Sequence, residues 1–466
     1  LRQQDPDYPG VGNSLGATLW RLGRLEEAEA ELQSAMEQPQ YADEAAVNLA
    51  LVHVGQGRLA AAEERLRWVL QRQPRHPGAL ANLGFVESMR GQLQEAAGHL
   101  RQALEIYPNY PEALYNLATI MRRTGAVEEA VALFERAIAV RANYADALSY
   151  LVHTLQHACL WDKLKRYGKR LDELNAELLR ADGTAAERPF VHISRSQDIA
   201  TNQRIARSWA KVMDKGTAAG RVSATPEGVA PVPGRRPLRI GYLSADFHDH
   251  ATAHLMRSLF GLHDRRRFRI HAYSYGPDDG SNYRTEIQKD CDRFIDLRDL
   301  SHWEAAEHIK RDGVDVLVDL KGYTQDNRLE ICSLRPAPII LTWLGYPGTL
   351  GADFIDYVVT DRIVTPEAHA RYYDEAFIYL PHTYQVTDYR QPIASEGVRR
   401  ADYGLPEGAF VFCSFNQTYK IESLMFSAWM KILQQVPESV LWLLSEQTFV
   451  QTNLRREAER RGVDGS

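Results

Sequence analysis

Three histidines lie within seven positions of the stretch YLSADFHDHATAHLM, residues 242–256: His248, His250 and His254. Imidazole nitrogens can bind a metal, exchange a proton or hydrogen-bond a substrate. On a helix, the four-residue spacing of His250 and His254 would place both rings on one face, which suits zinc. The same spacing suits a helix start that holds a substrate. The stretch alone predicts a site for chemistry without separating a metal site from a substrate site.

A second polar cluster follows an apolar run near the C-terminal end of the sequence. The stretch AFVFCSFNQTYKI, residues 409–421, is typical of a buried strand followed by Asn416, Gln417, Tyr419 and Lys420. We expect Lys420 to lie in the first turn of the next helix, where helix amides and an ammonium together favour a phosphate. Most lysines are solvated surface residues. A polar cluster directly after a buried strand is nevertheless what the ligand edge of a parallel sheet requires.

The elements that must position these residues alternate between strand and helix. Apolar, β-branched runs occupy residues 238–244, 268–275, 293–297, 314–320, 339–345 and 354–360. Helical patterns separate several of them, notably at residues 254–263 and 303–313. This alternation predicts a parallel sheet covered on both faces. The histidine stretch would then follow the first strand and begin a helix, at the edge where such sheets bind ligands.

The first third of the chain repeats with a period of 34 residues. Glycines, alanines and leucines keep this period at Gly23, Gly57, Gly91 and Gly125, at Ala28, Ala62, Ala96 and Ala130, and at Leu49, Leu83 and Leu117. Apolar residues recur at helical spacing on both sides of each glycine, which predicts units of helix, turn and helix. We therefore expect a repeat domain over residues 1–155, a helical transition over 156–215 and a linker over 216–236. Such a stack forms a right-handed superhelix with a concave face.

Three asparagines also keep the period: Asn48, Asn82 and Asn116, with Tyr150 where a fourth would fall. An amide carries both a donor and an acceptor, so a row of asparagines on the concave face could bind a peptide backbone without reading its sequence. Asparagine is also common at this repeat position without any ligand. The sequence leaves peptide binding and a plain structural role open.

Composition excludes several classes of function. The net charge is −6 and no long basic run is present, which disfavours nucleic acid as a main partner. No apolar stretch reaches the length of a membrane span, and no secretory signal is visible. The four cysteines, Cys159, Cys291, Cys332 and Cys413, show no metal or redox spacing. We therefore expect a cytoplasmic protein with ordinary thiols.

The repeats, together with SADFHDHATAHLM, PDDGSNYR, RPAPIILTWLGYPGTLGADFIDY, LPHTY and FNQTYKI, resemble the O-linked N-acetylglucosamine transferases of glycosyltransferase family 41. The resemblance implies an α-solenoid of tetratricopeptide repeats followed by a GT-B fold with two Rossmann-like lobes, at residues 237–396 and 397–466. Because about 70 residues follow position 396, we expect the second lobe to be partial. The implied reaction moves N-acetylglucosamine from UDP-N-acetylglucosamine to serine or threonine hydroxyls of proteins, with inversion and without a metal or cofactor.

The resemblance also implies roles for individual residues. His250 matches the active-site histidine beside donor and acceptor, whose role as base or positioning group the family leaves open. Lys420 matches the lysine that neutralises the departing diphosphate, with Gln417 and Tyr419 also on the donor. Pro347 and Thr349 of the LGYPGT loop would line the sugar side. The asparagine row would guide the protein acceptor.

Two other functions fit part of the sequence. The related protein O-fucosyltransferases share the repeats and the fold but use GDP-fucose. A non-enzymatic tetratricopeptide scaffold would explain the repeats and leave the α/β half without a purpose.

Overall fold

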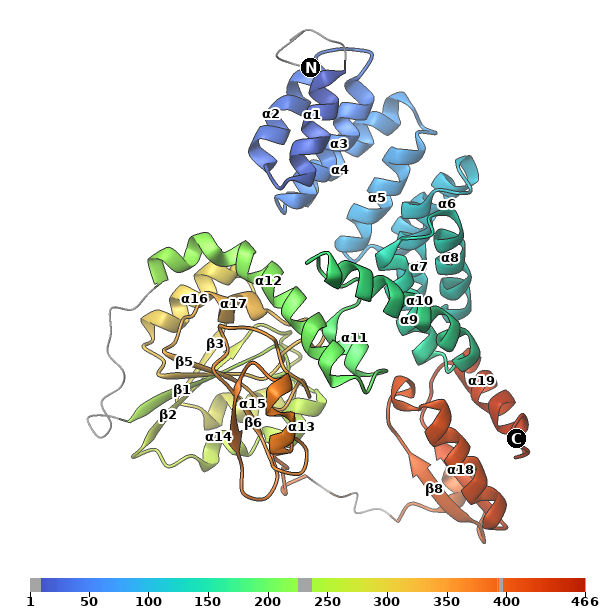
Figure 1. Ribbon diagram of the computed structural model, residues 1–466, viewed down its shortest axis with the longest axis vertical. Helices are drawn as coiled ribbons and strands as arrows, with labels where there is room; N and C mark the ends of the chain where they lie inside the picture. The colour runs from blue at the N-terminus through green and yellow to red at the C-terminus, as the bar shows by residue number, and fades with distance from the viewer. Residues whose placement is uncertain (1–9, 225–236, 392, 394–396, 466) are drawn as a thin grey trace. The chain divides into compact units, whose positions relative to one another are not determined.

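The computed structural model describes residues 10–224, 237–391, 393 and 397–465 (Figure 1). Contacts divide the chain into two compact units, Leu1–Leu171 with Phe410–Ser466, and Asp172–Ala409. The last stretch of sequence therefore belongs to the same compact unit as the repeats.

Helix pairs build the first unit: α1 (Val11–Arg21), α2 (Leu25–Met36), α3 (Ala42–Gly55), α4 (Leu59–Arg72), α5 (Pro77–Met89), α6 (Leu93–Ile106), α7 (Pro111–Arg123) and α8 (Val127–Val140). The four periodic glycines follow α1, α3, α5 and α7 with φ between 75° and 83°, a conformation that glycine adopts without strain. The four periodic alanines are fully buried where the paired helices meet. The helix–turn–helix prediction is confirmed.

The C-terminal segment packs on two helices of the first unit, α9 (Ala145–His157) and the start of α10 (Trp161–Arg180). It contains β8 (Phe410–Ser414), the 3-10 turn η3 (Thr418–Lys420), α18 (Ser423–Gln435), β9 (Ser439–Leu443) and α19 (Thr448–Glu459), with β8 and β9 parallel. The Trp161 indole donates to the Ile421 carbonyl at 3.2 Å, and the Asn453 amide donates to the Ala158 carbonyl at 2.9 Å. Buried apolar side chains around Trp161 and Phe426 form the shared core.

A parallel sheet of seven strands forms the second unit, as the strand–helix alternation predicts. Its strands are β1 (Leu238–Ser244), β2 (Phe268–Ser274), β3 (Arg293–Asp296), β4 (Val316–Asp319), β5 (Ile339–Thr342), β6 (Tyr357–Thr360) and β7 (Ala376–Tyr379). The strand order is β3-β2-β1-β4-β5-β6-β7. Successive strands are added on one side of β1 up to β3, and from β4 onward they are added on the other side, as in Rossmann-like sheets. The six predicted runs contain β1 to β6, whereas the short edge strand β7 was not predicted.

Helices cover both faces of this sheet (Figure 1). One core lies under α12 (Ile199–Ala224), α16 (His302–Arg311) and α17 (Leu329–Ser333). The other lies under α13 (Ala251–Met256), α14 (Leu259–Leu262) and α15 (Asn282–Asp290). The predicted helix at 254–263 is two short helices, because the chain turns between Met256 and Leu259.

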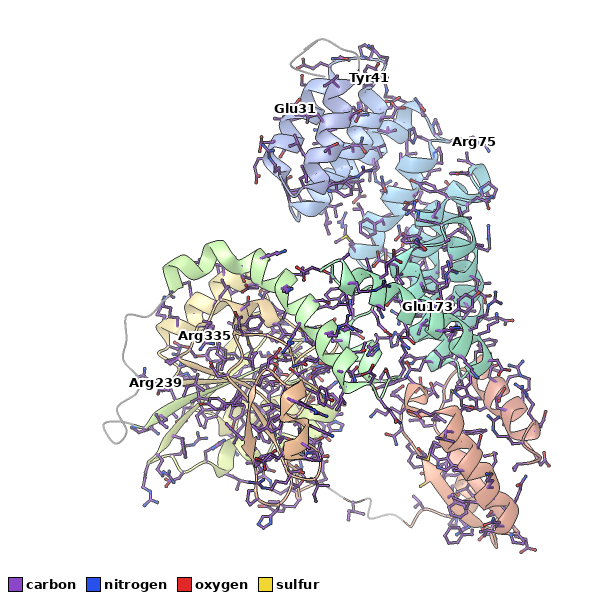
Figure 2. All side chains as sticks on the ribbon, viewed as in Figure 1. Glu31, Tyr41, Arg75, Glu173, Arg239 and Arg335 are labelled. Carbon is purple, nitrogen blue, oxygen red and sulfur yellow. The ribbon has the colours of Figure 1, made fainter. Side chains whose placement is uncertain are left out.

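Three aspartates fix the strands at the amino edge of the sheet. Each directly precedes one strand and accepts a hydrogen bond from an amide of the neighbouring strand. Asp315, before β4, accepts from Arg239 N at 2.8 Å, and Asp292, before β3, accepts from Ile270 N at 2.7 Å. Asp356, before β6, accepts from Ile340 N at 2.8 Å. Arg335, labelled with Arg239 in Figure 2, lies 3.1 Å from the same Asp356 carboxylate.

The start of the predicted linker over 216–236 is helical in the structure. After α11 (Pro189–Ile193), α12 continues to Ala224, so helix covers the first nine residues of that segment. The remaining residues, 225–236, lie outside the described part of the chain. The alanine-rich start of the segment favours helix, a propensity that the glycines and threonine did not outweigh.

Cys159, Cys291, Cys332 and Cys413 are all free thiols, and Cys159 and Cys332 are buried. Among the described residues, no helix is both long enough and apolar enough to cross a bilayer.

Replacing Gly276 with alanine should destabilise the second unit. A Cβ there would lie 1.7 Å from the Ala245 carbonyl oxygen, a backbone atom that cannot rotate away. We expect a loss of about 1–3 kcal/mol in the free energy of unfolding, typical of overpacking, measured by urea unfolding. Gly216→Ala in α12, where a Cβ meets no atom within 4 Å, is the control and should stabilise slightly. Equal stability of the Gly276→Ala protein and wild type would contradict this close approach.

Candidate functional site

The histidine stretch connects β1 to α13, at the carboxyl end of the first strand, as predicted. His250 is the N-cap of α13, with extended backbone (φ −145°, ψ 152°), and its Nδ1 accepts from Thr252 N at 3.2 Å. His254 lies within the helix, where its Nε2 is 2.6 Å from Asp249 Oδ1. His250 stands outside the helix, and each ring has its own partner, the Thr252 amide for His250 and Asp249 for His254. The spacing therefore does not build the zinc geometry that a continuous helix would.

Residues of the PDDGSNYR motif hold this loop in place. Asp279 accepts from Asp249 N at 2.8 Å, and backbone amides lower the pKa of Asp279 to about 2. The buried Arg284 guanidinium donates to the Phe247 carbonyl at 3.2 Å and to Ser274 Oγ at 3.0 Å. The motif is thus a scaffold for the histidine loop.

A buried ion pair lies directly behind His250. Lys321 Nζ is 2.7 Å from Asp246 Oδ1, and the two residues are 4% and 5% exposed. Asp246 Oδ2 accepts from Thr252 Oγ1 at 3.2 Å and lies 3.5 Å from His250 Nδ1. Asp246 follows β1 and Lys321 follows β4, so the pair spans the point where the strand order reverses.

A cavity of about 470 Å³ opens beside this pair at the carboxyl edge of the sheet. Its lining comes from the loops after four strands: Ala245, Asp246, His248, His250, Tyr275, Gly276, Pro277, Arg298, Lys321, Gln325 and Asp326. The Tyr275 hydroxyl is buried and has no hydrogen-bond partner among the described residues. Concave sites with convergent polar groups at this edge of an α/β sheet are the usual place for a ligand.

Of the residues that line this cavity, sequence reasoning singled out His250 but not Asp246, Tyr275 and Lys321. All three come within two residues of a strand end, so the rule that ligands bind at carboxyl ends could have found them. Their convergence depends on the strand order, which single-sequence patterns do not give.

The surroundings of His250 favour its neutral form near pH 7. Burial lowers its pKa from the ordinary value, the Asp246 carboxylate opposes this, and the Lys321 ammonium and the two neighbouring histidines add to the lowering. The side chain keeps 41% of its surface exposed. A neutral, accessible imidazole at the cavity wall can hydrogen-bond a substrate.

One group of three possible metal ligands occurs among the described residues, away from the histidine loop. Ligand atoms of Asp172, Glu187 and His192 lie within 4.8 Å of one another. Arg195 donates to both carboxylates, at 2.7 Å to Asp172 and 2.5 and 2.6 Å to Glu187. Both carboxylates therefore already have a cationic partner, Arg195.

The LGYPGT loop presents its two predicted donor residues differently. Pro347 is exposed, whereas Thr349 is buried and donates its hydroxyl to Glu375 Oε2 at 2.7 Å. Leu350 N donates to the other oxygen of Glu375 at 2.7 Å, and burial raises the pKa of this carboxyl. Thr349 anchors the loop through Glu375.

Lys420 lies in the first unit, on the 3-10 turn η3. The helix α18 begins only at Ser423, so the prediction that Lys420 occupies the first helical turn is wrong. The turn closes instead because Lys420 N donates to the Gln417 carbonyl at 2.9 Å. The Lys420 side chain is exposed, lies 5.9 Å from the centre of the Tyr419 ring, and forms no ion pair with the described residues.

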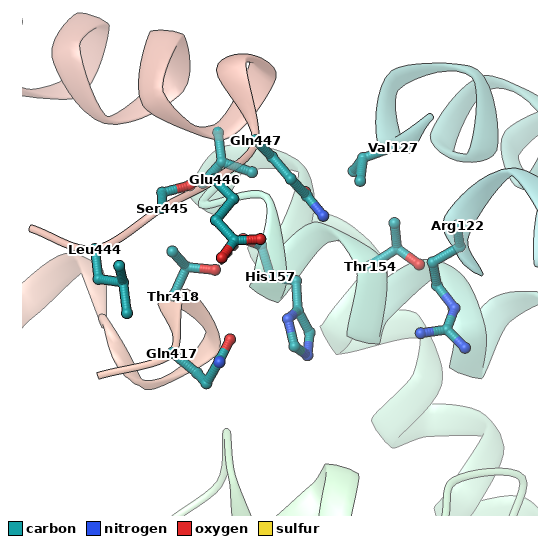
Figure 3. Close-up of a pocket in the computed structure, with 11 residues that line it drawn as sticks. Arg122, Val127, Thr154, His157, Gln417, Thr418, Leu444, Ser445, Glu446 and Gln447 are labelled. Atoms are coloured by element: carbon teal, nitrogen blue, oxygen red, sulfur yellow. Dashed lines mark hydrogen bonds between the residues drawn. The ribbon is translucent and has the colours of Figure 1, made fainter. Parts of the chain in front are cut away.

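Gln417 and residues of the repeat helices line a second cavity, of about 240 Å³ (Figure 3). Loop residues after β8 and β9 form one wall, and Arg122, Thr154 and His157 form the other. The Thr418 hydroxyl donates to the His157 carbonyl at 2.7 Å, which holds the two walls together. Burial lowers the pKa of His157 to about 4, so its ring is neutral.

The asparagine row lies where the period predicts. Asn48, Asn82 and Asn116 are half-buried residues of α3, α5 and α7, the first helices of successive repeats. Helix α3 contacts α5 and α5 contacts α7, so the three amides lie on one surface. Asn48 donates to Asn13 of α1 at 2.8 Å, which adds a fourth amide. Tyr150 ends the row, with Arg122 5.4 Å above its ring.

The sequence profile of glycosyl transferase family 41 matches residues 229–399 and 392–466, about half of the chain. The chain belongs to glycosyltransferase family 41. Tetratricopeptide repeat profiles match residues 11–34, 47–111 and 88–162. The family 41 match contains the histidine loop, the LGYPGT loop and the Lys420 turn.

Curated relatives are similar to part of this chain. The probable UDP-N-acetylglucosamine–peptide N-acetylglucosaminyltransferase SEC of Arabidopsis thaliana is 35% identical over 324 residues, 67% of this chain and 33% of that protein. The corresponding enzyme of Caenorhabditis elegans is 30% identical over 341 residues, 49% of this chain and 30% of that protein. This chain thus spans about a third of the length of these curated relatives.

A solved structure also resembles this family 41 chain. The structure of a mutant O-GlcNAc transferase of Thermobaculum terrenum matches with a TM-score of 0.57 and 26% identity, over 91% of this chain and 73% of that chain.

Asp319, at the end of β4, should make the stability of the second unit depend on pH. Burial raises its pKa from 3.8 to about 6, against hydrogen bonds from the Gly322 and Lys321 amides and the Lys321 charge. Between about pH 4 and 6 the folded protein therefore holds a proton on Asp319 that the unfolded chain has lost. The stability that this bound proton gives to the folded state is lost as the pH rises through 6.

We expect the free energy of unfolding of the Asp319→Asn protein to rise relative to that of wild type by about 1–3 kcal/mol as the pH goes from 4 to 7. Urea unfolding at several pH values measures the difference. A difference between the two proteins that stays constant with pH would contradict the raised pKa.

Proposed function

We propose that this family 41 protein transfers N-acetylglucosamine from UDP-N-acetylglucosamine to serine or threonine hydroxyls of proteins. The family match over residues 229–466 carries the proposal. The names of the relatives from Arabidopsis thaliana and Caenorhabditis elegans and of the Thermobaculum terrenum structure support the donor and the acceptor class. The cavity beside His250 supports a substrate site in the second unit.

Lys420 suits the leaving group of this reaction. Breaking the bond between the sugar and the diphosphate leaves negative charge on the diphosphate oxygens. A cation that already stands in place stabilises that charge in the transition state. The Lys420 ammonium is exposed and forms no ion pair with the described residues, so binding a phosphate would cost it no internal partner. Gln417 and Tyr419 lie on the same turn and would contact the same nucleotide.

The proposed role of His250 is to contact the reacting groups as a neutral imidazole. The cavity wall gives it access, and the N-cap position fixes the ring through Thr252 N. Pro347 would face the sugar from the LGYPGT loop, with Thr349 holding that loop. The chemistry needs no metal, and the absence of a metal and a cytoplasmic location remain predictions from the sequence.

The repeats would guide the acceptor. Half-buried amides on α3, α5 and α7 form one surface, and each can pair with both the N–H and the C=O of an extended peptide. Contacts to the backbone select extended conformation and leave the acceptor sequence free.

Nucleotide binding and transfer should both depend on Lys420. We expect calorimetry to show that the protein binds UDP more tightly than GDP, and that Lys420→Ala weakens UDP binding. We also expect Lys420→Ala to lower kcat/KM for transfer to a protein acceptor about a hundredfold or more, the loss typical of one transition-state charge contact. Lys431→Ala, an exposed lysine of α18, is the matched control.

Each outcome of this experiment decides something. Preference for GDP would move the proposal to fucose transfer. Binding of neither nucleotide would leave the scaffold function. Equal effects of Lys420→Ala and Lys431→Ala would remove Lys420 from the site while leaving the donor assignment intact.

The asparagine row should matter for long acceptors only. We expect the Asn82→Ala, Asn116→Ala double variant to raise KM for extended protein acceptors several-fold, because two pairs of backbone hydrogen bonds are lost. Transfer to a short peptide that cannot reach α5 should be unchanged. Gln94→Ala with Gln102→Ala removes two exposed amides from α6 and serves as control. If the asparagine and glutamine double variants have the same KM for long acceptors, the asparagines have only a structural role.

A further inference from the structure

Lys321 is a buried cation that the proposed reaction has not yet used. Its ammonium contacts one oxygen of Asp246, at 2.7 Å, and its side chain is 5% exposed. Burying an ion pair costs solvation that the attraction between the partners only partly offsets. A pair placed behind His250, in the wall of the cavity, therefore calls for an explanation beyond stability.

The proton on His250 is determined by its neighbours. Nδ1 accepts from Thr252 N at 3.2 Å, so its lone pair is already in use. A neutral imidazole carries one proton, which must then be on Nε2. In this tautomer Nε2 is a hydrogen-bond donor and has no lone pair that could take a proton from a substrate.

The tautomer with its proton on Nδ1 would need a hydrogen-bond acceptor, and Asp246 could supply one. A proton on Nδ1 would face the Thr252 amide, another donor, and its nearest acceptor would be Asp246 Oδ2 at 3.5 Å. A free carboxylate at this distance would favour that tautomer, as in catalytic pairs where an aspartate orients a histidine base. Here Lys321 neutralises the carboxylate through Oδ1, and the Thr252 hydroxyl occupies Oδ2 at 3.2 Å.

We propose that Lys321 is a positioning residue that holds His250 in the tautomer with its proton on Nε2. By binding Asp246, Lys321 keeps the carboxylate from drawing a proton to Nδ1. His250 then serves as a hydrogen-bond donor to a substrate oxygen in the cavity, and its Nε2 cannot accept a proton from the substrate. The identity of that oxygen rests on the proposed function, whereas the tautomer does not.

The charges around His250 agree with this assignment. Asp246 and Lys321 face it from the loops after β1 and β4, and His248 and His254 face it from its own loop and from α13. Burial and the Lys321 charge lower the pKa of His250, and Asp246 alone raises it. The neutral form therefore predominates near pH 7.

Nitrogen NMR of the full chain, labelled with ¹⁵N-histidine, reads the tautomer directly. The His250 signals are assigned by their loss in a His250→Gln protein. We expect an unprotonated Nδ1 and a protonated Nε2 in the neutral state. This measurement uses free protein, so a failure to transfer sugar would overturn the proposed function and leave this result standing. A proton on Nδ1 in wild type would overturn the proposal.

Variants of Lys321 test its part. In Lys321→Met we expect the neutral ring to shift toward the Nδ1–H form and the titration midpoint to rise by about 1 unit, because the carboxylate is no longer paired. Lys321→Arg should behave as wild type. Lys321→Gln keeps a donor for Asp246 without the charge and should shift the midpoint in the same direction by less. It serves as the charge test if the methionine variant does not fold.

A double variant separates the charge from packing. Lys321→Met with Asp246→Asn replaces the buried pair by neutral groups, an exchange that folded proteins tolerate well. We expect it to return His250 to the Nε2–H form. Wild-type tautomer and midpoint in folded Lys321→Met or Lys321→Gln would overturn the proposal, as would a double variant that keeps the shift of Lys321→Met.

Discussion

All seven strands of the second unit run in one direction, and this constraint determines where chemistry can occur. The loop after each strand opens at the same edge, and the reversal of strand order between β1 and β4 leaves room there. The cavity, His250 and the Asp246–Lys321 pair all lie at this edge. Gly276 lets the loop after β2 approach the backbone of Ala245, which closes the edge around the cavity.

His250 and Lys420 differ in their electrostatic surroundings. His250 is partly buried and neutral, with its one lone pair taken by a backbone amide. Lys420 is exposed and charged, on a turn whose own hydrogen bonds use only backbone atoms. A neutral donor suits an oxygen that must be oriented, and a free cation suits an oxygen that acquires charge. Under the proposed function, each group would suit a different substrate oxygen.

Features set by residues close together in the sequence could be predicted from the sequence. Features set by contacts between residues far apart in the sequence could not. The period of 34 residues placed the repeats, because each glycine and alanine acts within its own helix pair. The strand runs placed His250 correctly at the end of β1. The Lys321–Asp246 contact joins residues 75 positions apart, and the packing of Trp161 on Ile421 joins residues 260 positions apart. Lys420 was misplaced because a 3-10 turn and a first helical turn share the same local sequence preferences.

Asp292, Asp315 and Asp356 connect neighbouring strands at the edge of the sheet opposite the cavity. Sliding one strand by a single residue would break such a bond and turn every side chain of that strand to the other face. Alignment is thus secured by side chains that take no part in binding. The loops at the cavity edge do not set this alignment, so substitutions in them can change what the cavity binds without shifting the strands.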